Sequence, residues 1–358
     1  MKKTNIGILG ATGMVGQRFV TLLQDHPYFE VKILAASPNS AGKKYQEAVD
    51  KRWKLENEIP SYAKDMEVYD VSDIENISQE VELVLCALDL DKESIIKIEE
   101  EYAKKEVIVI SNNSANRCTK DVPVIIPEVN KDQLEILDYQ KKRLNTKKGF
   151  ILAKPNCSIQ SYVPALDALK EFGVKEVIVS TYQAISGSGK NFEQWPEMIG
   201  NIIPYIEGEE EKSEQEPLKI WASIENGQIK NASQPKISAQ CIRVSVLDGH
   251  TATVAVKFEK KPSREEIIDR WNNYNSKIKD LDLPLAPKKF LHYIEESNRP
   301  QPLLDREIEN GMGISIGRLR EDSIFDYKFV CLSHNTIRGA AGGALLSAEL
   351  IKKLGYLE

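Results

Sequence analysis

The feature that most constrains this chain is a glycine-punctuated turn near its start. Gly10, Gly13 and Gly16 recur at every third position in GATGMVG, directly after the apolar run NIGIL and before the amphipathic run VGQRFVTLL. Glycine permits a tight strand-to-helix turn and lets backbone N–H groups approach a pyrophosphate, whose charge a helix N-terminus favours. The pattern predicts a dinucleotide-binding loop, with a plain strand-to-helix turn as the alternative.

The residues around this loop alternate between apolar strands and helix-length segments. We expect strands at 5–10, 29–37, 81–88 and 106–112, and helices at 13–26 and 92–105. Strands separated by helices favour a parallel, doubly wound sheet. The sequence therefore predicts a Rossmann-type α/β domain over residues 1–155.

Beyond about residue 154 the pattern changes to longer strands, expected at 174–186, 237–248, 251–260, 314–321 and 324–333, the last two as an antiparallel pair. We expect an α+β catalytic and dimerisation domain over 156–334. Its open sheet face needs a cover, from another subunit or from helices of the same chain. Residues 335–358 are predicted to form a helix that returns to the first domain, and the acidic run 207–216 is interpreted as a solvated helix start.

Length, charge and cysteine content exclude several classes of protein. A chain of 358 residues exceeds one ordinary core, which agrees with two domains. Its 48 basic and 54 acidic side chains are interspersed, which argues against nucleic acid as a partner. No apolar run approaches the roughly 18 to 20 residues that span a bilayer, and the start lacks the pattern of a signal peptide. Five cysteines without a C-x-x-C pair predict neither a disulfide framework nor a metal site, so we expect a cytoplasmic protein.

The end of the second predicted strand bears on the choice of dinucleotide. Folds that select NAD usually place Asp or Glu there to hold the ribose 2′-OH, whereas this strand ends in Ala-Ala-Ser37. Ser37 offers a hydroxyl where a carboxylate would repel a 2′-phosphate, and Lys43 and Lys44 follow closely enough to neutralise one. The sequence favours NADP over NAD, with an ordinary solvated loop as the alternative for the lysines.

One cysteine has the setting of a nucleophile. Cys157 lies in KPNCS, between the strand GFILA and the predicted helix IQSYVPALDALK, and a helix N-terminus lowers a thiol pKa. The others lie within apolar strands or on a polar loop and are interpreted as core or inert thiols: Cys86, Cys241, Cys331 and Cys118. We therefore predict a reactive thiolate at Cys157.

A thiol nucleophile needs a base, and the chain has four histidines. His26 and His292 lie in settings typical of structural histidines, whereas His334, just before the last predicted helix, remains open. His250 ends RVSVLDGH, where an Asp-Gly turn after a strand can aim its imidazole and the guanidinium of Arg243 into one cleft. We favour His250 as the base.

Several motifs together resemble one family. GATGMVGQ, SNNSANR, PNCS, TYQAISGSG, EPLK, RVSVLDGH and NTIRGAAGG, in this order and spread over essentially the whole chain, resemble the aspartate-semialdehyde dehydrogenases, most closely their archaeal and fungal branch. The resemblance implies a fold similar to that of glyceraldehyde-3-phosphate dehydrogenase. It also implies phosphate- and NADP-dependent interconversion of L-aspartate 4-semialdehyde and 4-aspartyl phosphate, in lysine, methionine and threonine biosynthesis, by a homodimer or a dimer of dimers.

The resemblance assigns roles to individual residues. Cys157 matches the nucleophile that forms the thioester, His250 its acid/base partner, and Gln183 a glutamine near the substrate carbonyl. Arg243 would hold the substrate α-carboxylate and Glu216 its ammonium group. Lys219, Arg117 and Asn156 would form the phosphate site. Glu216 and Lys219 are spaced i and i+3 on a predicted helix and so share a face, with a surface ion pair as the alternative.

The expected cofactor site draws on segments far apart in the sequence. Ser186 and Gly187 match the family's cofactor loop, and Asn335 matches the residue at the nicotinamide end. The full expected set is Gly10, Thr12, Gly13, Met14, Val15, Ser37, Lys43, Cys86, Ala87, Asn113, Ser186, Gly187, Asn335 and Thr336. No metal is expected.

Other functions remain as rivals. A malonyl-CoA reductase, or a related acyl-CoA reductase of the same architecture, would also use Cys157. Such a substrate has no α-ammonium and releases no phosphate, so Glu216, Lys219 and Arg243 would have less reason to occur together. A non-catalytic NADP-binding sensor is the rival of a different class, and loss of Cys157 or His250 would be its mark; both are present.

Overall fold

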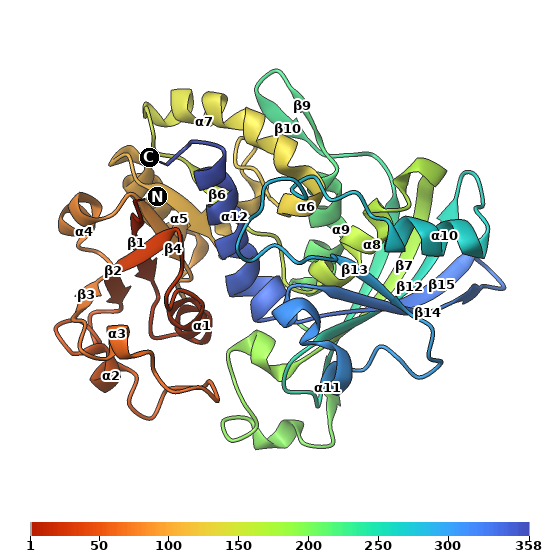
Figure 1. The fold of residues 1–358 in the computed structure, drawn as a ribbon, viewed down its shortest axis with the longest axis horizontal. Helices are drawn as coiled ribbons and strands as arrows, with labels where there is room; N and C mark the ends of the chain where they lie inside the picture. The colour runs from red at the N-terminus through yellow and green to blue at the C-terminus, as the bar shows by residue number, and fades with distance from the viewer. Residues whose placement is uncertain (1, 358) are drawn as a thin grey trace.

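The computed structural model describes residues 2–357, and within this range the N-terminal part forms a six-stranded parallel sheet (Figure 1). Its strands, in spatial order, are β3 (Val68–Asp70), β2 (Phe29–Ala36), β1 (Thr4–Leu9), β4 (Leu83–Cys86), β5 (Ile108–Ser111) and β6 (Ile151–Ala153). This 3-2-1-4-5-6 order is that of a dinucleotide-binding fold. The predicted Rossmann-type sheet is confirmed; Met1 and Glu358, which the expected domain ranges include, lie outside the described residues.

Helices cover this sheet because its strands are apolar on both sides. Every residue of β4 and β5 is buried, which is the pattern of a parallel strand with a helix over each face. The helices of this part are α1 (Met14–Leu22), α2 (Tyr45–Ala48), α3 (Ser61–Lys64), α4 (Ile74–Glu80), α5 (Lys92–Lys104), α6 (Pro127–Asn130) and α7 (Leu137–Leu144). The predicted helices at 13–26 and 92–105 correspond to α1 and α5.

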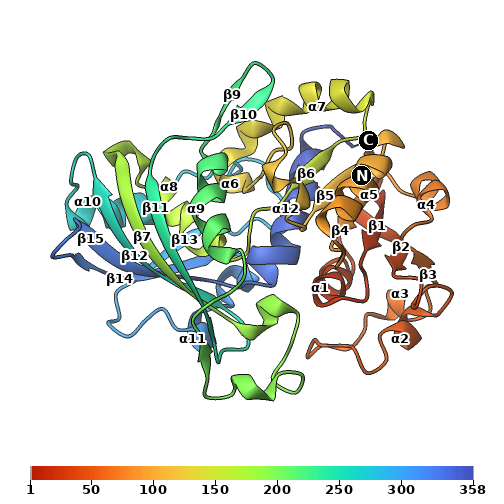
Figure 2. The same cartoon turned by 180° about the vertical axis from the view of Figure 1, so that it is seen from behind.

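The C-terminal part of the described chain forms a seven-stranded mixed sheet (Figure 2). Its strands, in spatial order, are β13 (Leu291–Ile294), β14 (Ile314–Glu321), β15 (Tyr327–Ser333), β12 (His250–Phe258), β7 (Val174–Gln183), β11 (Lys236–Val244) and β8 (Ile202–Ile203). β14 and β15 pair antiparallel, as predicted, whereas β7 and β11 run parallel. A small hairpin of β9 (Ser223–Glu225) and β10 (Gln228–Lys230) stands apart.

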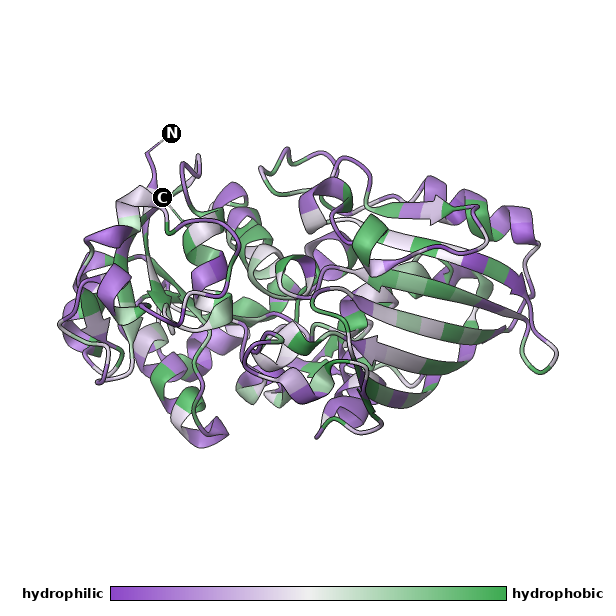
Figure 3. Ribbon diagram, turned by 90° about the horizontal axis from the view of Figure 1, so that it is seen from below, coloured by the Kyte–Doolittle hydropathy of each residue, from purple (hydrophilic) through white to green (hydrophobic). Residues whose placement is uncertain are grey.

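One face of this mixed sheet is covered and the other is not. The accompanying helices are α8 (Val163–Asp167), α9 (Glu209–Ile220), α10 (Arg264–Asn272) and α11 (Pro302–Asp305). Along β7, Val177 and Val179 are buried while the alternate residue Ile178 is 47% exposed. In Figure 3 the strands of this sheet face the viewer with apolar and polar residues mixed along them.

The end of the chain crosses back to the N-terminal sheet, as predicted, but its helix starts later than expected. Residues Ile337–Ala341 form a wider π-helical turn, and α12 spans Gly342–Lys353. α12 contacts α1, α6 and β5, and Figure 1 shows it between the sheets. A Cβ on Gly342 would lie 2.6 Å from the sulfur of Met312, so close packing requires this glycine.

This arrangement brings the carboxyl ends of the parallel strands to face the mixed sheet, which is where doubly wound folds bind ligands. We propose a division of the chain near residue 155, with the residues from 335 onward returning to the N-terminal unit. Among residues 2–357, no helix is both long and apolar enough to cross a bilayer.

Candidate active site

The structure brings the predicted nucleophile and the predicted base together. Cys157 lies just beyond β6, and His250 is the first residue of β12. The Cys157 sulfur is 3.4 Å from His250 Nε2. On the other side of the ring, the Ala184 backbone N–H donates to His250 Nδ1 at 3.0 Å, which fixes the orientation of the imidazole.

The predicted lowering of the Cys157 pKa is wrong. The chain after Cys157 forms only a short 3₁₀ turn (Ile159–Ser161) before the five-residue α8, so little helix dipole points at the sulfur. Burial raises the pKa of Cys157, and the negative charge of Glu209 raises it further. The nearby cations Lys154, Arg243 and Arg117 act in the opposite direction without reversing the shift.

Ala184 contacts both the predicted base, His250, and the predicted carboxylate-binding arginine, Arg243. Arg243, near the end of β11, donates from Nη1 to the Ala184 carbonyl at 2.7 Å and is only 6% exposed. A Cβ on Gly187 would lie 2.9 Å from Arg243 Nη1 and 3.0 Å from His250 Cε1, so Gly187 packs against both side chains. The imidazole and the guanidinium that RVSVLDGH was predicted to bring together thus contact the same two residues, Ala184 and Gly187.

A carboxylate and a lysine that the sequence analysis missed also line the site. Glu209, at the start of α9, is buried and accepts hydrogen bonds from Asn156 Nδ2 at 2.9 Å and from Gln183 Nε2 at 3.1 Å. Lys212 donates to Glu209 at 2.8 Å. Although burial opposes ionisation, the pairing with Lys212 and the bonds from Gln183 and Asn156 hold the pKa of Glu209 below its usual value.

The missed pair had a signal in the sequence. Glu209 and Lys212 are spaced i and i+3, as are Glu216 and Lys219, and they begin the same helix. The interpretation of the acidic run as solvated is wrong for Glu209, which turns inward and is 8% exposed, and holds for Glu211. Spacing alone could not choose between the pairs, because both can face one side of a helix.

The contacts of Glu216 and Lys219 differ from the expected ones. The carboxylate of Glu216 accepts from Arg117 Nη1 at 2.9 Å and from the Asn156 backbone N–H at 2.6 Å, so both of its oxygens are engaged. Lys219 Nζ donates to the carbonyls of Arg117 and Thr119, each at 2.7 Å. Both residues are buried, so the alternative of a surface ion pair is wrong. Burial lowers the pKa of Lys219 to about 8.

A second buried lysine lies behind the nucleophile. Lys154 Nζ donates to the Gly339 carbonyl, and a Cβ on Gly339 would lie 2.9 Å from Cys157 Cβ. Gly339 therefore packs directly on the nucleophile, and Lys154 ties the C-terminal π-helical turn to it. Burial, reinforced by Arg117, lowers the pKa of Lys154 to about 7.

The glycine-rich loop has the geometry of a dinucleotide cradle. Gly10 has φ +84°, and a Cβ on it would lie 2.2 Å from the Ala87 carbonyl oxygen. A Cβ on Gly16 would lie 2.2 Å from the Gly10 carbonyl oxygen. Gly13 is exposed and would meet only the Gly10 oxygen at 3.5 Å, so packing within the chain does not require it. Its open face leaves room for a ligand at the N-terminus of α1.

The other expected cofactor residues border this loop. Ser37 is exposed just beyond β2, and Lys43 Nζ donates to the Asn39 carbonyl at 2.8 Å. Lys44 is paired with Asp65 at 2.7 Å. Of the remaining loop residues, Met14 and Val15 begin α1 and Thr12 lies two positions before it, while Cys86 ends β4 and Ala87 follows it.

A buried carboxylate organises the loop after β5. Glu99 accepts from the hydroxyl of Ser111 at 2.5 Å and from the amides of Asn113 and Asn116 at 3.1 and 2.7 Å. Burial raises its pKa despite these bonds. Arg117 follows on the same loop. The hydrogen bonds of Glu99 therefore hold the backbone segment that carries the Arg117 side chain.

Two C-terminal residues of the expected cofactor set, Asn335 and Thr336, lie on the other side of the site. Asn335 donates from Nδ2 to the Ser186 hydroxyl at 2.7 Å and accepts the Gly249 N–H at 2.8 Å. It therefore links the cofactor loop to the residue before His250. Thr336 is buried beside it, 3.4 Å from His334 Nδ1.

The other histidines have structural partners. His26 Nε2 lies 2.9 Å from the buried carboxylate of Glu349, and His292 Nε2 lies 2.8 Å from the Lys289 carbonyl oxygen. His334 Nε2 is 3.4 Å from Glu307. Within residues 2–357, no group of three or more His, Cys, Asp or Glu side chains is placed to hold a metal ion.

A dinucleotide fold whose glycine loop faces a Cys–His pair defines a class, the dehydrogenases that oxidise or reduce an acyl group held as a cysteine thioester. Family models described as "Semialdehyde dehydrogenase, NAD binding domain" and "Semialdehyde dehydrogenase, dimerisation domain" match residues 5–137 and 164–338.

Individual relatives narrow the class. The aspartate-semialdehyde dehydrogenases of Archaeoglobus fulgidus and Saccharomyces cerevisiae are each 41% identical to this chain, over 98% and 96% of both chains respectively. A crystal structure of the Candida albicans enzyme with NADP superposes with a TM-score of 0.89 at 37% identity, covering 99% of this chain and 100% of that one. The chain belongs to the aspartate-semialdehyde dehydrogenase family, in agreement with the resemblance.

Proposed function

We propose that this chain catalyses the NADP- and phosphate-dependent interconversion of L-aspartate 4-semialdehyde and 4-aspartyl phosphate, a step of lysine, methionine and threonine biosynthesis. One observation carries the proposal: the Cys157–His250 pair lies between a buried guanidinium, Arg243, and a buried carboxylate, Glu209. An α-amino acid aldehyde carries a carboxylate and an ammonium group. The two buried charges match those groups.

We assign the substrate ammonium to Glu209 rather than to Glu216. Both oxygens of Glu216 are already engaged by Arg117 and Asn156, so Glu216 acts as a brace between them. Glu209 instead accepts hydrogen bonds from the side-chain amides of Asn156 and Gln183 and pairs with Lys212, which is partly exposed. Arg243 keeps its proposed role, since a guanidinium binds a carboxylate through paired N–H groups.

We assign the phosphate to Arg117 and Lys212, with Asn156 beside them. Lys219 is a poor ligand because its ammonium is buried against the carbonyls of Arg117 and Thr119. Lys212 is a better one because its side chain is 30% exposed and the carboxylate that it contacts, Glu209, turns to the substrate ammonium in this scheme. Arg117 and Lys212 thus provide two positive charges next to Cys157, and Asn156 adds an amide beside them.

The tautomer of His250 decides what the imidazole can do. Because Nδ1 accepts the Ala184 N–H, a neutral ring carries its proton on Nε2, facing the sulfur. Burial, together with the positive charge of Arg243, lowers the pKa of His250 well below its usual value, so the ring stays neutral. We infer that Nε2–H donates a hydrogen bond to the Cys157 thiolate and then to the oxyanion of the tetrahedral adduct. This role replaces the predicted removal of a proton by His250.

The thiol of Cys157 loses its proton to solvent, because His250 Nε2 already carries one, and from the thiolate onward the covalent steps balance without a proton passing through His250. In the biosynthetic direction the Cys157 thiolate forms a C–S bond with the acyl phosphate, and phosphate leaves with the C–O electron pair. In the reverse direction the thiolate adds to the aldehyde, and phosphate later cleaves the thioester and returns the thiolate. When bound, NADPH would supply the hydride that reduces the thioester to the tetrahedral adduct, whose collapse releases the aldehyde and the thiolate, and NADP⁺ would accept that hydride in the reverse direction. Gln183, beside Glu209 at the end of β7, helps to orient the carbonyl.

The loop residues fit NADP. Gly13 leaves an open approach to the N-terminus of α1, and the end of β2 presents the Ser37 hydroxyl without a carboxylate beside it. Lys43 supplies a positive charge close to Ser37. Asn113, Ser186, Gly187, Asn335 and Thr336 are proposed to hold the nicotinamide end.

We propose that the open face of the mixed sheet forms a homodimer interface. This face exposes Ile178. The neighbouring segment carries Ile199, Ile202 and Tyr205, and each of these three side chains is more than 60% exposed. Apolar surface of this kind is typical of an interface with another copy. The dimer, or a dimer of dimers, would work in the cytoplasm, where the Cys157 thiol stays reduced.

The experiment that tests the function is spectrophotometric. NADP⁺ reduction should require both aspartate semialdehyde and inorganic phosphate, and omission of either should abolish it. The matched assay supplies NADPH with malonyl-CoA, the substrate of the rival function. Reduction of malonyl-CoA, or semialdehyde oxidation that is independent of phosphate, would contradict the proposal.

A further inference from the structure

A buried lysine next to the nucleophile takes no part in the steps proposed above. Lys154 follows β6 directly, lies three residues before Cys157 and is 2% exposed. Its Nζ donates to the Gly339 carbonyl, and its backbone N–H donates to the Ser111 carbonyl at 2.8 Å. Among residues 2–357, no carboxylate lies within ion-pair distance of Nζ. A charge buried without a counter-ion is costly, and lysine is almost never fully buried unless it is paired.

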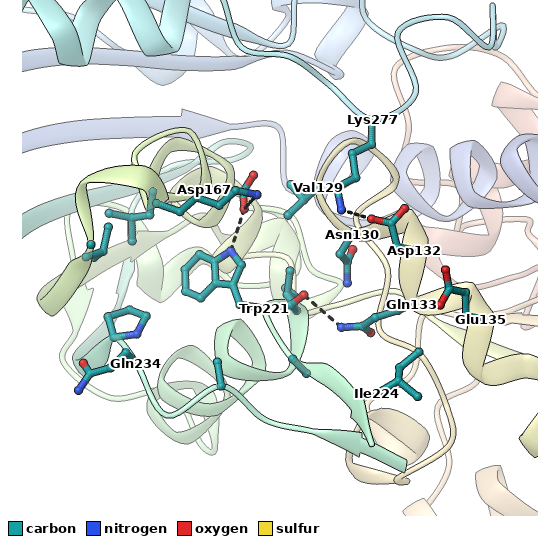
Figure 4. Close-up of a pocket in the computed structure, with 18 residues that line it drawn as sticks. Val129, Asn130, Asp132, Gln133, Glu135, Asp167, Trp221, Ile224, Gln234 and Lys277 are labelled. Atoms are coloured by element: carbon teal, nitrogen blue, oxygen red, sulfur yellow. Dashed lines mark hydrogen bonds and ion pairs between the residues drawn. The ribbon is translucent and has the colours of Figure 1, made fainter. Parts of the chain in front are cut away.

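The charges around the large cavity in Figure 4 show the contrast. This cavity, of about 620 Å³, lies between the C-terminal ends of α8 and α9 and the turn Lys131–Ile136. There Lys277 pairs with Asp132. Asp167 accepts from the indole N–H of Trp221 at 3.1 Å. These charged groups have partners within the chain, unlike the ammonium group beside the nucleophile.

Two guanidinium groups near the nucleophile also have partners of their own. Arg117 pairs with Glu216 at 2.9 Å. Arg338 pairs with Glu128 at 2.5 Å. The two carboxylates are therefore already neutralised, and neither of them is left to balance the charge of Lys154.

Gly339 connects the ammonium group to the nucleophile. A Cβ on Gly339 would lie 2.9 Å from Cys157 Cβ and 3.2 Å from Cys157 Cα, so the glycine packs directly on the nucleophile. The carbonyl of the same glycine accepts the hydrogen bond from Lys154 Nζ. The ammonium group and the nucleophilic residue thus contact one and the same residue.

The charges of the two side chains act on each other. Burial, reinforced by Arg117, lowers the pKa of Lys154 to about 7, whereas a thiolate at Cys157 and the carboxylate of Glu216 act in the opposite direction. Burial raises the pKa of Cys157, as does Glu209. Among the cations that oppose this second shift, Lys154 has the largest effect.

The neutral ring inferred for His250 leaves the charge of the thiolate unbalanced. A protonated imidazole would supply a positive charge, whereas a neutral Nε2–H supplies only a hydrogen bond. In the proposed function Arg243 meets the substrate carboxylate, and Arg117 and Lys212 meet phosphate. A thiolate in a buried site needs a cation of its own.

We propose that Lys154 is a positioning residue for the reaction, because its buried ammonium group, held on the Gly339 carbonyl, is the counter-charge of the Cys157 thiolate. The same charge favours departure of the thiolate when the tetrahedral adduct collapses. This inference rests on the proposed role of Cys157 as nucleophile, and it does not depend on which acyl group the thiol receives.

The pH dependence of alkylation tests the inference without any need for turnover. Lys154→Met keeps much of the apolar stem and removes the charge. In the full-length enzyme without substrate, the profile of iodoacetamide alkylation at Cys157 should move to higher pH by about one unit or more, which is about a tenfold lower rate at neutral pH. The mass of the peptide that contains Cys157 reports its reaction separately from that of the exposed thiol of Cys118.

Two further variants separate charge from stability. Lys154→Gln keeps an amide that can donate to a carbonyl but carries no charge, so it should show the same shift and keeps the test decisive if Lys154→Met fails to fold. Lys352→Met is the matched control, because Lys352 is also buried and donates to the Thr4 hydroxyl at 2.5 Å, at the far end of α12. Its alkylation profile should match that of the parent even if its stability falls.

Steady-state kinetics provide a second measurement. Lys154→Met should lower kcat by about tenfold at neutral pH and leave the KM values for semialdehyde and phosphate within about twofold, because neither compound contacts Lys154 in the proposed function. An unchanged alkylation profile in both Lys154 variants, or an equal shift in Lys352→Met, overturns the inference. Failure of the parent to oxidise the semialdehyde would instead overturn the proposed function, and the alkylation profiles would still decide the role of Lys154.

Discussion

The parallel and the mixed sheet contribute to the site in different ways. The parallel sheet offers the backbone of the turn at Gly10 and Gly13, which is the proposed dinucleotide cradle, and the loops beyond β5 and β6, which carry Arg117 and Cys157. The mixed sheet offers side chains, with Gln183, Arg243 and His250 at the ends of β7, β11 and β12. In the proposed function, cofactor recognition therefore depends mainly on the shape of a turn, and catalysis depends on side chains that both sheets position.

This difference predicts which property a substitution should change, cofactor affinity or catalysis. A turn made by glycine tolerates a larger residue only where a Cβ has room. A substitution at such a position should alter the affinity for the dinucleotide rather than the rate of the chemical step. The buried charges around Cys157 share partners, since Asn156 contacts both Glu209 and Glu216. A change there disturbs more than one role. The predictions below test this division, from the largest expected effect to the smallest.

Removal of the Cys157 thiol should abolish most of the turnover and leave cofactor binding almost unchanged, and so it should distinguish catalysis from cofactor recognition. Cys157→Ser should lower turnover by about a thousandfold or more, because a serine alkoxide is rarely available at neutral pH. NADP affinity, measured by fluorescence titration, should stay close to that of the parent. Activity within about tenfold of the parent would remove Cys157 from the mechanism.

The two lysines of α9 should respond differently. Lys212→Met should raise the KM for phosphate about ten- to a hundredfold, because one charge-assisted contact is lost. Lys219→Met should instead lower the free energy of unfolding by about 1–3 kcal/mol, because two buried carbonyls lose their donor. Steady-state kinetics and denaturant titration of both variants provide the comparison. The reverse pattern would restore Lys219 to the phosphate site.

A charge at the end of β2 should change only the cofactor preference. Ser37→Asp should weaken NADP about tenfold, because a carboxylate repels the 2′-phosphate, and should leave NAD unchanged or improved. Dissociation constants for both dinucleotides test this. Equal losses for NADP and NAD would place Ser37 away from the ribose.

The glycine loop offers a matched pair of substitutions. Gly13→Ala should weaken NADP about fivefold with little change in stability, because a Cβ there meets nothing closer than 3.5 Å. Gly16→Ala should destabilise the fold, because its Cβ would lie 2.2 Å from the Gly10 oxygen. Thermal unfolding and cofactor titration distinguish the variants. Equal destabilisation by both would mean that packing, not a ligand, requires Gly13.

The pH dependence of Cys157 is the most sensitive probe of its charged surroundings. Thiolate forms as pH rises, and burial and Glu209 raise the thiol pKa, so alkylation of the free enzyme should be slow at neutral pH and accelerate at alkaline pH. Glu209→Gln removes a negative charge and should shift the rate profile to lower pH. Iodoacetamide rates measured against pH give the two curves. A shift to higher pH would exclude Glu209 as a neighbour of the thiol.

Local patterns predicted the N-terminal region well. The strands β1, β2, β4 and β5, the glycine turn and the helices α1 and α5 each follow from residues adjacent in sequence. The setting of Cys157 could not be predicted in this way. Its thiol pKa depends on Glu209, Lys154, Arg243 and Arg117, which come from four separate segments.

The sequence by itself determined the parallel sheet, the glycine turn of a dinucleotide fold and the pairing of Cys157 with His250, which the structure places in contact. The hydrophobic period, the glycine spacing and the order of the motifs are properties of the sequence, and they can be recognised without knowledge of the fold. Only the tertiary structure decided which face of α9 turns inward, so that Glu209 reaches Asn156 while Lys219 is buried on carbonyls. It also placed the Ala184 N–H against His250 Nδ1, the contact from which we infer the tautomer of the ring. The physical reason is that hydrogen bonds and charges act through space, between residues that the sequence keeps far apart.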